Sequence, residues 1–220
     1  MKSTDGVKSV SALALALIVG TSVGWAGTPP PSQLAAQWWQ WAVAVPAAQS
    51  PIGDTTGEFA ALGQSGPVWF LAGTWWDNTV ERTFSVPAGK PLFFPIVNNF
   101  WAYYVPLQWG RPTAPTEPGG PINFVRLMSA EGIDEVQLTD MECDVDGVVI
   151  PITEQNRVQS VPLTLQVPAD NVWQEDPVHF VGCVDNGYYV LLAPLAPGEH
   201  TIHFAVTSVG LEVTDHITVE

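Results

Sequence analysis

Aromatic side chains gather between residues 75 and 109, next to polar side chains that could bind the hydroxyl groups of a sugar. The aromatic residues and the acid beside them are Trp75, Trp76, Asp77, Trp101, Tyr103, Tyr104 and Trp109. An aromatic ring offers a large contact area at a low entropy cost, and its face can stack on the apolar face of a sugar ring. The cluster therefore predicts a glycan-binding platform. A simpler interpretation is that these rings pin a long loop onto the core.

Two histidines and a glutamate give a second pattern, which could bind zinc or copper. The last two expected strands would form a hairpin in which Val206 pairs with Leu211. His203, His216 and Glu212 then share the outward face of the hairpin, with the two histidines as diagonal neighbours about 7 Å apart. A solvated polar face explains the same residues more simply, so we predict no metal and no cofactor.

Carboxylates give only weak catalytic patterns. Asp54 with Glu58, or Asp77 with Glu81, could supply the paired acids of a glycoside hydrolase, but an acidic chain contains such pairs by chance. Asp215 stands in phase with the apolar residues of the last expected strand, which predicts a buried, hydrogen-bonded acid or a bulge that turns it outward. We therefore expect a binding or structural protein rather than an enzyme. The alternatives are a polysaccharide-acting hydrolase and an envelope or matrix component without a small ligand.

The first 26 residues have the pattern of a secretory signal peptide. Lys2 and Lys8 precede the apolar run SALALALIVG, and small residues follow at Gly24 and Ala26. The run is too short to span a bilayer comfortably. We expect residues 1–26 to be removed and the mature protein to work in the periplasm or the external medium.

The net charge of −15 limits the partners of this chain, since 22 acidic residues face only 7 basic ones. An acidic surface repels nucleic acids and anionic membranes. We therefore expect no nucleic-acid partner and no membrane span after signal removal. The expected partners are an extracellular glycan or another envelope protein.

Cys143 and Cys183 are the only cysteines, and both stand in apolar segments. In an oxidising compartment, two such cysteines predict one disulfide. The bond would close a loop of about 40 residues and stabilise the fold by roughly 3–4 kcal/mol in the chain-entropy model.

Short apolar segments separated by turn residues predict a mainly β fold, and the length suits one domain over residues 27–220. Asp146-Gly147 predicts a tight hairpin turn rather than the start of a calcium loop, which lacks its closing glutamate here. Strands at this spacing predict an antiparallel β-sandwich, jelly-roll-like or Ig-like.

Two helices are expected beside these strands. Leu34, Trp38 and Trp41 recur at helical spacing and predict an amphipathic helix over residues 33–45, ended by Pro46. A shorter apolar stripe predicts a helix over residues 121–131. Residues 100–120, which are rich in aromatic residues, proline and glycine, are expected to form an extended surface segment.

Several segments resemble a group of secreted bacterial proteins of uncharacterised function. The resembling segments are WWQW at 38–41, DTTG at 54–57, GQSGPVWFLAG at 63–73, PAGKPLFFPIVN at 87–98 and PGEHTIHF at 197–204. They span most of the chain after the signal peptide. The resemblance implies an exported β-rich domain, and it implies no catalytic residue.

Overall fold

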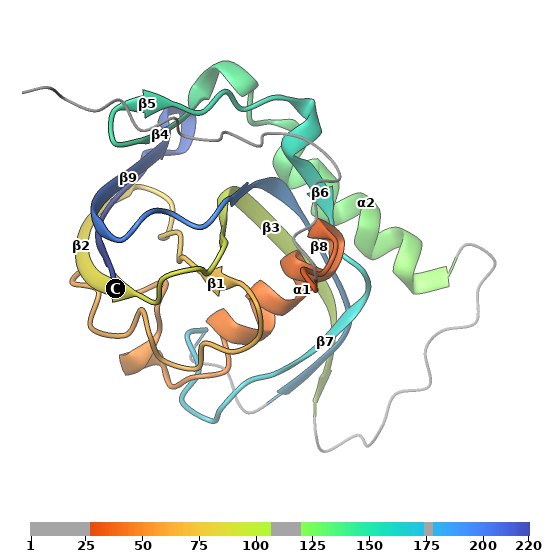
Figure 1. The fold of residues 1–220 in the computed structure, drawn as a ribbon. Coiled ribbons are helices and arrows are strands. Elements are labelled where there is room, and N and C mark those ends of the chain that lie inside the picture. The colour runs from red at the N-terminus through yellow and green to blue at the C-terminus, as the bar shows by residue number, and fades with distance from the viewer. Residues whose placement is uncertain (1–26, 107–119, 174–177) are drawn as a thin grey trace, which may run out of the picture.

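The computed structural model describes residues 27–106, 120–173 and 178–220, and within these ranges the protein is mainly β, with two α-helices and two mixed sheets (Figure 1). The expected signal peptide and Trp109 lie outside the described residues. In the described ranges, no helix is long and apolar enough to cross a membrane.

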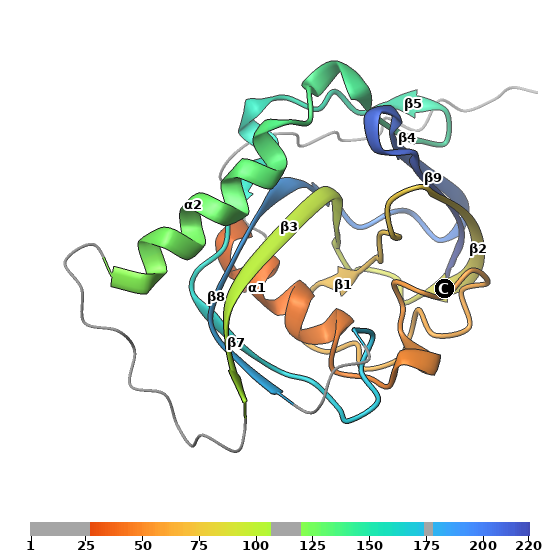
Figure 2. The same cartoon turned by 180° about the vertical axis from the view of Figure 1, so that it is seen from behind.

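The first sheet has the strand order β1-β3-β8-β6, with β7 also paired to β8. Its strands are β1 (Trp69–Phe70), β3 (Leu92–Pro106), β6 (Arg157–Gln159), β7 (Leu163–Gln166) and β8 (Val178–Leu192). β1 runs parallel to β3, whereas the pairs of β8 with β3, β6 and β7 are antiparallel. β3 and β8 form the long central ribbon of this sheet (Figure 2).

The second sheet has the strand order β2-β10-β9-β4-β5. Its strands are β2 (Asn78–Val86), β4 (Met141–Val145), β5 (Val148–Val149), β9 (Gly198–Val206) and β10 (Leu211–Val219). β10 runs parallel to β2 along its whole length. The expectation of purely antiparallel sheets is therefore wrong. The alternation of apolar and polar residues marks the buried face of a strand but not the direction of its neighbour.

Two of the expected hairpin details are confirmed. β9 and β10 are antiparallel, with Val206 opposite Leu211. β4 and β5 are joined by Asp146 and Gly147, which both have positive φ, 54° and 75°. Two adjacent positive φ values are the signature of a tight turn that favours Asp-Gly.

The two helices cover opposite sides of the β3–β8 ribbon (Figure 2). α1 spans Pro31–Ala42, slightly earlier than the expected 33–45, because proline suits the first turn of a helix. α2 spans Gly120–Asp134 and extends beyond the expected 121–131 at both ends. Short 3₁₀ turns lie at Ala47–Gln49 (η1), Leu138–Asp140 (η3), Glu154–Asn156 (η4) and Thr207–Val209 (η5).

Two hydrophobic clusters lie on the two faces of the first sheet. The larger one joins it to the second sheet and to the end of α2, with Phe94, Ile133 and Phe204 fully buried. The other joins it to α1, with Leu34, Trp38 and Phe93 among its buried members. α1 thus packs on the first sheet and covers a face that would otherwise expose apolar side chains.

An extra residue in β3 decides which side chains face α1. Pro95 pairs with Tyr189 and Val97 pairs with Tyr188, so Ile96 is a bulge residue. Before the bulge, an odd-numbered residue, Phe93, faces α1. After the bulge, an even-numbered residue, Phe100, faces α1. Because a bulge shifts the alternation by one, residues 98 and 100 face α1, and residues 99 and 101 face the opposite side.

The expected disulfide is wrong, because Cys143 and Cys183 are both free thiols. Cys143 in β4 points into the cluster between the two sheets, whereas Cys183 in β8 points into the cluster under α1. The first sheet itself therefore lies between the two sulfur atoms. Burial raises the pKa of each thiol to about 12, so neither is reactive in the folded protein.

The expected surface segment over residues 100–120 is also corrected in part. Residues 100–106 continue β3 and pair with β8, so this part belongs to the central ribbon of the first sheet. α2 begins at Gly120, and residues 107–119 lie outside the described ranges.

Candidate functional site

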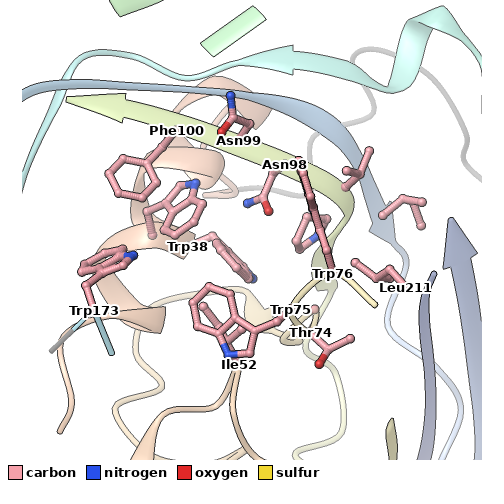
Figure 3. A pocket seen from close by; sticks show the side chains of 15 residues that line it. Trp38, Ile52, Thr74, Trp75, Trp76, Asn98, Asn99, Phe100, Trp173 and Leu211 are labelled. Carbon is pink, nitrogen blue, oxygen red and sulfur yellow. The ribbon is translucent and has the colours of Figure 1, made fainter. Parts of the chain in front are cut away.

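A pocket of about 320 Å³ lies beside α1, between the loop after β1, the middle of β3 and the start of β10 (Figure 3). Its aromatic lining consists of Trp38, Trp39, Trp75, Trp76, Phe100 and Trp173, and its polar lining includes Thr74 and Asn98. A concave, mainly aromatic pocket with a few polar groups is the usual form of a small-ligand site.

The inner wall of the pocket is a rigid stack of aromatic rings. The centroid of Trp39 lies 5.1 Å from that of Trp38 and 4.5 Å from that of Phe100. Trp173 continues the wall, with its centroid 5.4 Å from that of Phe100. The Nε1 atom of Trp38 donates to the carbonyl of Leu71 at 2.8 Å, which fixes this ring against the chain after β1. Rings held in this way lose little further entropy when a ligand stacks on them.

Trp75 and Trp76 form the outer wall, and they are the exposed aromatic residues of the pocket. Their side chains are 41% and 56% exposed. The loop that carries them is anchored behind them, because Asn78 donates to the hydroxyl of Thr74 at 2.9 Å. These two residues were predicted from the sequence as part of a binding platform, and the structure brings them to the same pocket (Figure 3).

Asp77 stands next to these tryptophans but shapes the turn instead of lining the pocket. Its φ of 56° is left-handed, a region that aspartate tolerates better than most residues. Its backbone N–H donates to the carbonyl of Val209 at 2.8 Å and ties the loop to the β9–β10 turn.

Trp101 is exposed by 40% but is not among the residues that line the pocket. The bulge at Ile96 explains the difference, because it turns Asn98 and Phe100 toward α1 and Trp101 to the opposite face. The pocket that Trp75 and Trp76 line therefore does not include Trp101. Tyr103 and Tyr104 lie in β3, but their side chains and the whole of Trp109 lie outside what the structure describes.

A buried acid lies directly behind the inner wall. Asp185 in β8 is fully buried, and its Oδ1 atom accepts a hydrogen bond from Nε1 of Trp39 at 2.7 Å. Its Oδ2 atom accepts one from the hydroxyl of Tyr189 at 2.7 Å. The same hydroxyl accepts a hydrogen bond from Nδ2 of Asn98 at 2.9 Å. Two residues of the pocket lining, Trp39 and Asn98, are thus connected to one carboxyl group.

Burial dominates the ionisation of this network. It raises the pKa of Asp185 from 3.8 to about 7, and the hydrogen bonds from Trp39 and Tyr189 lower it only in part. Burial, together with the adjacent acid, raises the pKa of Tyr189 well above 10. Asp185 therefore changes its charge near neutral pH, whereas Tyr189 keeps its proton.

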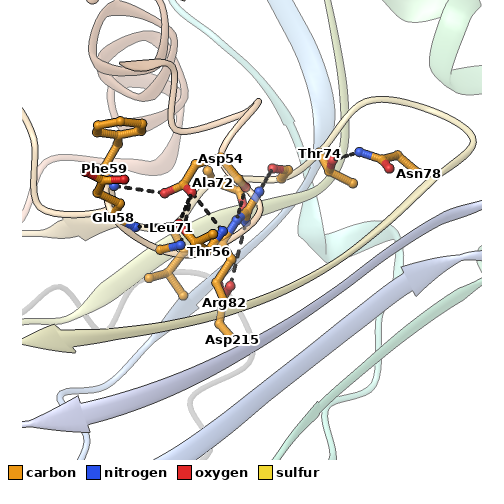
Figure 4. Close-up of polar contacts among 12 residues, drawn as sticks. Asp54, Thr56, Glu58, Phe59, Leu71, Ala72, Thr74, Asn78, Arg82 and Asp215 are labelled. Atoms are coloured by element: carbon orange, nitrogen blue, oxygen red, sulfur yellow. Dashed lines mark hydrogen bonds and ion pairs between the residues drawn. The ribbon is translucent and has the colours of Figure 1, made fainter. Parts of the chain in front are cut away.

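A second buried acid, Asp215, lies in the inner face of the second sheet beside Arg82 (Figure 4). Of the two expectations for Asp215, the structure shows the buried acid and no bulge, since its side chain is 0% exposed. The expected hydrogen bond is wrong, because neither carboxyl oxygen has a hydrogen-bond partner and Arg82 lies beside it only as an ion pair, at 3.7 Å. Burial raises its pKa, and the charge of Arg82 offsets part of this effect. Arg82 also donates to the carbonyls of Asp54, Ala72 and Gly73 at 2.7, 2.8 and 2.9 Å. These contacts give the pair a structural role in joining the loops around β1.

Asp54, considered above as one member of a possible pair of acids, has a structural role. Its carboxylate accepts hydrogen bonds from the backbone N–H groups of Thr56, Gly57 and Phe59. Burial opposes its ionisation, but these bonds outweigh burial and lower its pKa. The DTTG segment is therefore a capped turn (Figure 4).

The histidines and the glutamate proposed for a metal site share the outer face of the second sheet, but they pair with separate acids. His203 contacts Asp144 and Glu212, both at 3.2 Å, whereas His216 contacts Glu81 at 2.8 Å. Across the described residues, no group of three or more His, Cys, Asp and Glu side chains could hold a metal ion. This face carries a network of polar pairs.

Comparison with known proteins adds no further assignment, since no protein-family model, no curated protein and no solved structure matches this chain. The site therefore has to be interpreted from its own geometry.

The sequence alone predicted Trp38 as a core residue and did not identify Asn98, Trp173 or Asp185 as part of a site. Asp185 did carry a signal, because it stands in phase with the buried Cys183 and Tyr189 of the same strand.

Proposed function

We propose that this protein is an exported binding protein that recognises a glycan in the aromatic pocket beside α1. The observation that carries the proposal is the pair of exposed tryptophans, Trp75 and Trp76, opposite a rigid wall of buried rings. Such an arrangement suits a ring that is apolar on its faces and polar at its edge, as a sugar ring is. Asn98 and Thr74 supply polar groups for the edge.

We also propose that the protein is exported and that its fold is a β-sandwich. The signal-like residues 1–26 and the acidic composition support a periplasmic or external location. We assign the two sheets to the sandwich class because side chains from both contribute to one hydrophobic cluster.

Binding is favoured over hydrolysis by the composition of the pocket. A glycoside hydrolase needs two carboxyl groups beside the scissile bond. The lining residues that the structure describes include no carboxylate, and Asp185 is connected to the pocket through Trp39 and Tyr189.

The test is a panel of oligosaccharides and polysaccharides titrated calorimetrically into the purified protein and its Trp75→Ala and Trp76→Ala variants. We expect saturable binding that each variant weakens at least about fivefold, by analogy with a nucleic-acid base, for which stacking on one aromatic ring contributes about 1–3 kcal/mol. The matched control is Trp101→Ala, since Trp101 has nearly the same exposure as Trp75 but lies outside the pocket.

Two results would contradict this proposal. One is the absence of binding by the folded wild-type protein across the panel, and the other is binding that Trp101→Ala weakens while Trp75→Ala does not. Release of reducing ends from any polysaccharide in the panel would instead support the hydrolase alternative.

A further inference from the structure

While Asp185 is ionised, the hydrogen bonds behind the pocket run in one direction. The hydroxyl of Tyr189 has one proton, and it donates this proton to Oδ2 of Asp185 at 2.7 Å. The oxygen of that hydroxyl can then only accept, and it accepts from Nδ2 of Asn98 at 2.9 Å. The nitrogen of the Asn98 amide is therefore turned toward the protein interior. Its oxygen, Oδ1, is the atom left for a ligand, and the amide group points into the pocket (Figure 3).

We infer that Asp185 and Tyr189 are positioning residues that hold Asn98 as a hydrogen-bond acceptor, so that the pocket selects ligands carrying a hydroxyl donor at this point. The inference rests on the proposed function, because it specifies how the same pocket chooses among its ligands. Asn99 does not share this role, since its Nδ2 atom donates to the carbonyl of Ser129 in α2 at 3.2 Å.

The surrounding packing keeps this arrangement in place. The ring of Tyr189 is stacked on that of Phe93, with centroids 4.9 Å apart and planes only 9° from parallel. Gly187 stands opposite Asn98 on β8, and a Cβ atom there would lie only 2.7 Å from Cβ of Asn98. The absence of a side chain at this position leaves room for the Asn98 side chain on the α1 face.

Protonation of Asp185 would reverse the direction of the hydrogen bonds. Oδ1 receives the indole N–H of Trp39, so an added proton has to reside on Oδ2 and point at Tyr189. Tyr189 would then donate to Asn98, whose amide has to flip and present its N–H₂ group to the pocket. The groups that contact Asp185 are Trp39 of α1, Ser160 and Tyr189, and of these only Tyr189 is titratable. The raised pKa of Asp185, about 7, places the reversal near neutral pH.

Asp185→Asn reproduces the protonated state at every pH, because its amide N–H₂ group donates to Tyr189 as the protonated acid does. The test compares two probes, a methyl glycoside that binds the wild-type protein and the same glycoside with its hydroxyl groups O-methylated. At pH 8.5 we expect the wild-type protein to prefer the free hydroxyl by about tenfold, the effect of one hydrogen bond. In Asp185→Asn, where the pocket presents a donor, we expect this preference to fall toward one.

The pH profile separates positioning from simple structural damage. The preference of the wild-type protein should fall as the pH decreases from 8.5 to 5.5, whereas that of Asp185→Asn should stay constant. Ser160→Ala is the matched control, since it removes the hydrogen bond to the backbone N–H of Asp185 without changing the carboxyl group. A preference in Asp185→Asn that equals the wild-type value, or a wild-type preference that does not change with pH, would overturn the inference.

A ligand-free measurement distinguishes this inference from the proposed function. In protein labelled with ¹⁵N, we expect the side-chain N–H₂ protons of Asn98 to exchange with water more slowly at pH 8.5 in the wild type than in Asp185→Asn. Equal exchange rates in the two folded proteins would refute the positioning role even if glycans bind. A clear difference in exchange without any glycan binding would leave the positioning role standing and reject the proposed ligand class.

Discussion

Arg82 lies beside Asp215 on the parallel strands β2 and β10, with its Nη1 atom 3.7 Å from Oδ1 of Asp215 and both side chains buried. The guanidinium group also binds the backbone carbonyl of Asp54, which precedes β1, and those of Ala72 and Gly73, which follow it. One side chain therefore joins the second sheet to the loop that continues into Trp75 and Trp76.

Replacement of Arg82 by methionine should destabilise the protein strongly. The change leaves three carbonyl groups without their donor and the buried acid without its opposite charge. Breaking a buried pair in this way costs about 3–5 kcal/mol. Urea unfolding followed by near-UV circular dichroism measures the loss. Thr79→Ala, on the exposed face of the same strand, is the control and should change stability by no more than about 0.5 kcal/mol. A loss as small as that of the control would show that the pair does not support the fold.

The stability of the protein should decrease as the pH rises from about 4 to 7. Burial raises the folded-state pKa of Asp185 from 3.8 to about 7, so in this range the folded protein holds more protons than the unfolded chain. Asp215 acts in the same direction. Below about pH 4 the lowered pKa of Asp54 acts in the opposite direction, because its protonation removes the charge that caps the DTTG turn.

Thermal unfolding scans between pH 4 and 8.5 test whether stability decreases as the pH rises. We expect a higher midpoint at pH 5 than at pH 8, with each kcal/mol of stability worth roughly 2–4 °C in a domain of this size. Asp185→Asn should make the profile less steep, because it removes one of the two buried acids that titrate in this range and leaves Asp215. A midpoint that rises toward pH 8 in the wild type would show that Asp185 is ionised over the whole range.

Thiol titration should find two free thiols and no disulfide. Both cysteines are buried with raised pKa values, so Ellman's reagent should label neither in the native protein and both in denaturant without reductant. In the Cys183→Ala variant, the number of thiols labelled in denaturant should fall from two to one. Zero thiols in the denatured, unreduced protein would mean that the cysteines are bonded.

A single added methyl group at Gly187 should disturb both the first sheet and the pocket. The new Cβ atom would lie 2.5 Å from the carbonyl oxygen of Val97 and 2.7 Å from Cβ of Asn98. We expect a loss of about 1–3 kcal/mol, typical of overpacking, measured by urea unfolding. Gly53→Ala is the comparison, since its nearest contacts of 3.8 and 3.9 Å are ordinary. Similar stabilities of the two variants would show that β3 and β8 can separate at this point.

The sequence was most informative where local alternation decides the structure. The apolar phase of β10 predicted the pairing of Val206 with Leu211, because a one-residue slip would expose the whole apolar face. It also marked Asp215 as either a buried acid or a bulge residue, and the first alternative is the one observed. The spacing of Leu34, Trp38 and Trp41 likewise placed these residues in a buried stripe of α1.

The sequence was least informative where the outcome depends on distant segments. The bulge at Ile96 depends on the pairing with β8, and it alone decides that Asn98 and not Trp101 faces the pocket. The disulfide expectation failed for a similar reason, because the identity of the two cysteines does not reveal that a sheet lies between them. Trp75 and Trp76 could be predicted as a site, but their partners come from α1, β3 and the chain at Trp173.

The position of β10 has a consequence for how the chain folds during synthesis. β10 follows every other strand in the chain, yet it lies inside the second sheet between β2 and β9. β2 therefore leaves the ribosome long before the strand that pairs with it, and Arg82 long before its acid. A sheet closed by such distant contacts forms slowly, since the connecting chain must first lose its entropy. The second sheet can therefore close around β10 only after nearly the whole chain has been made.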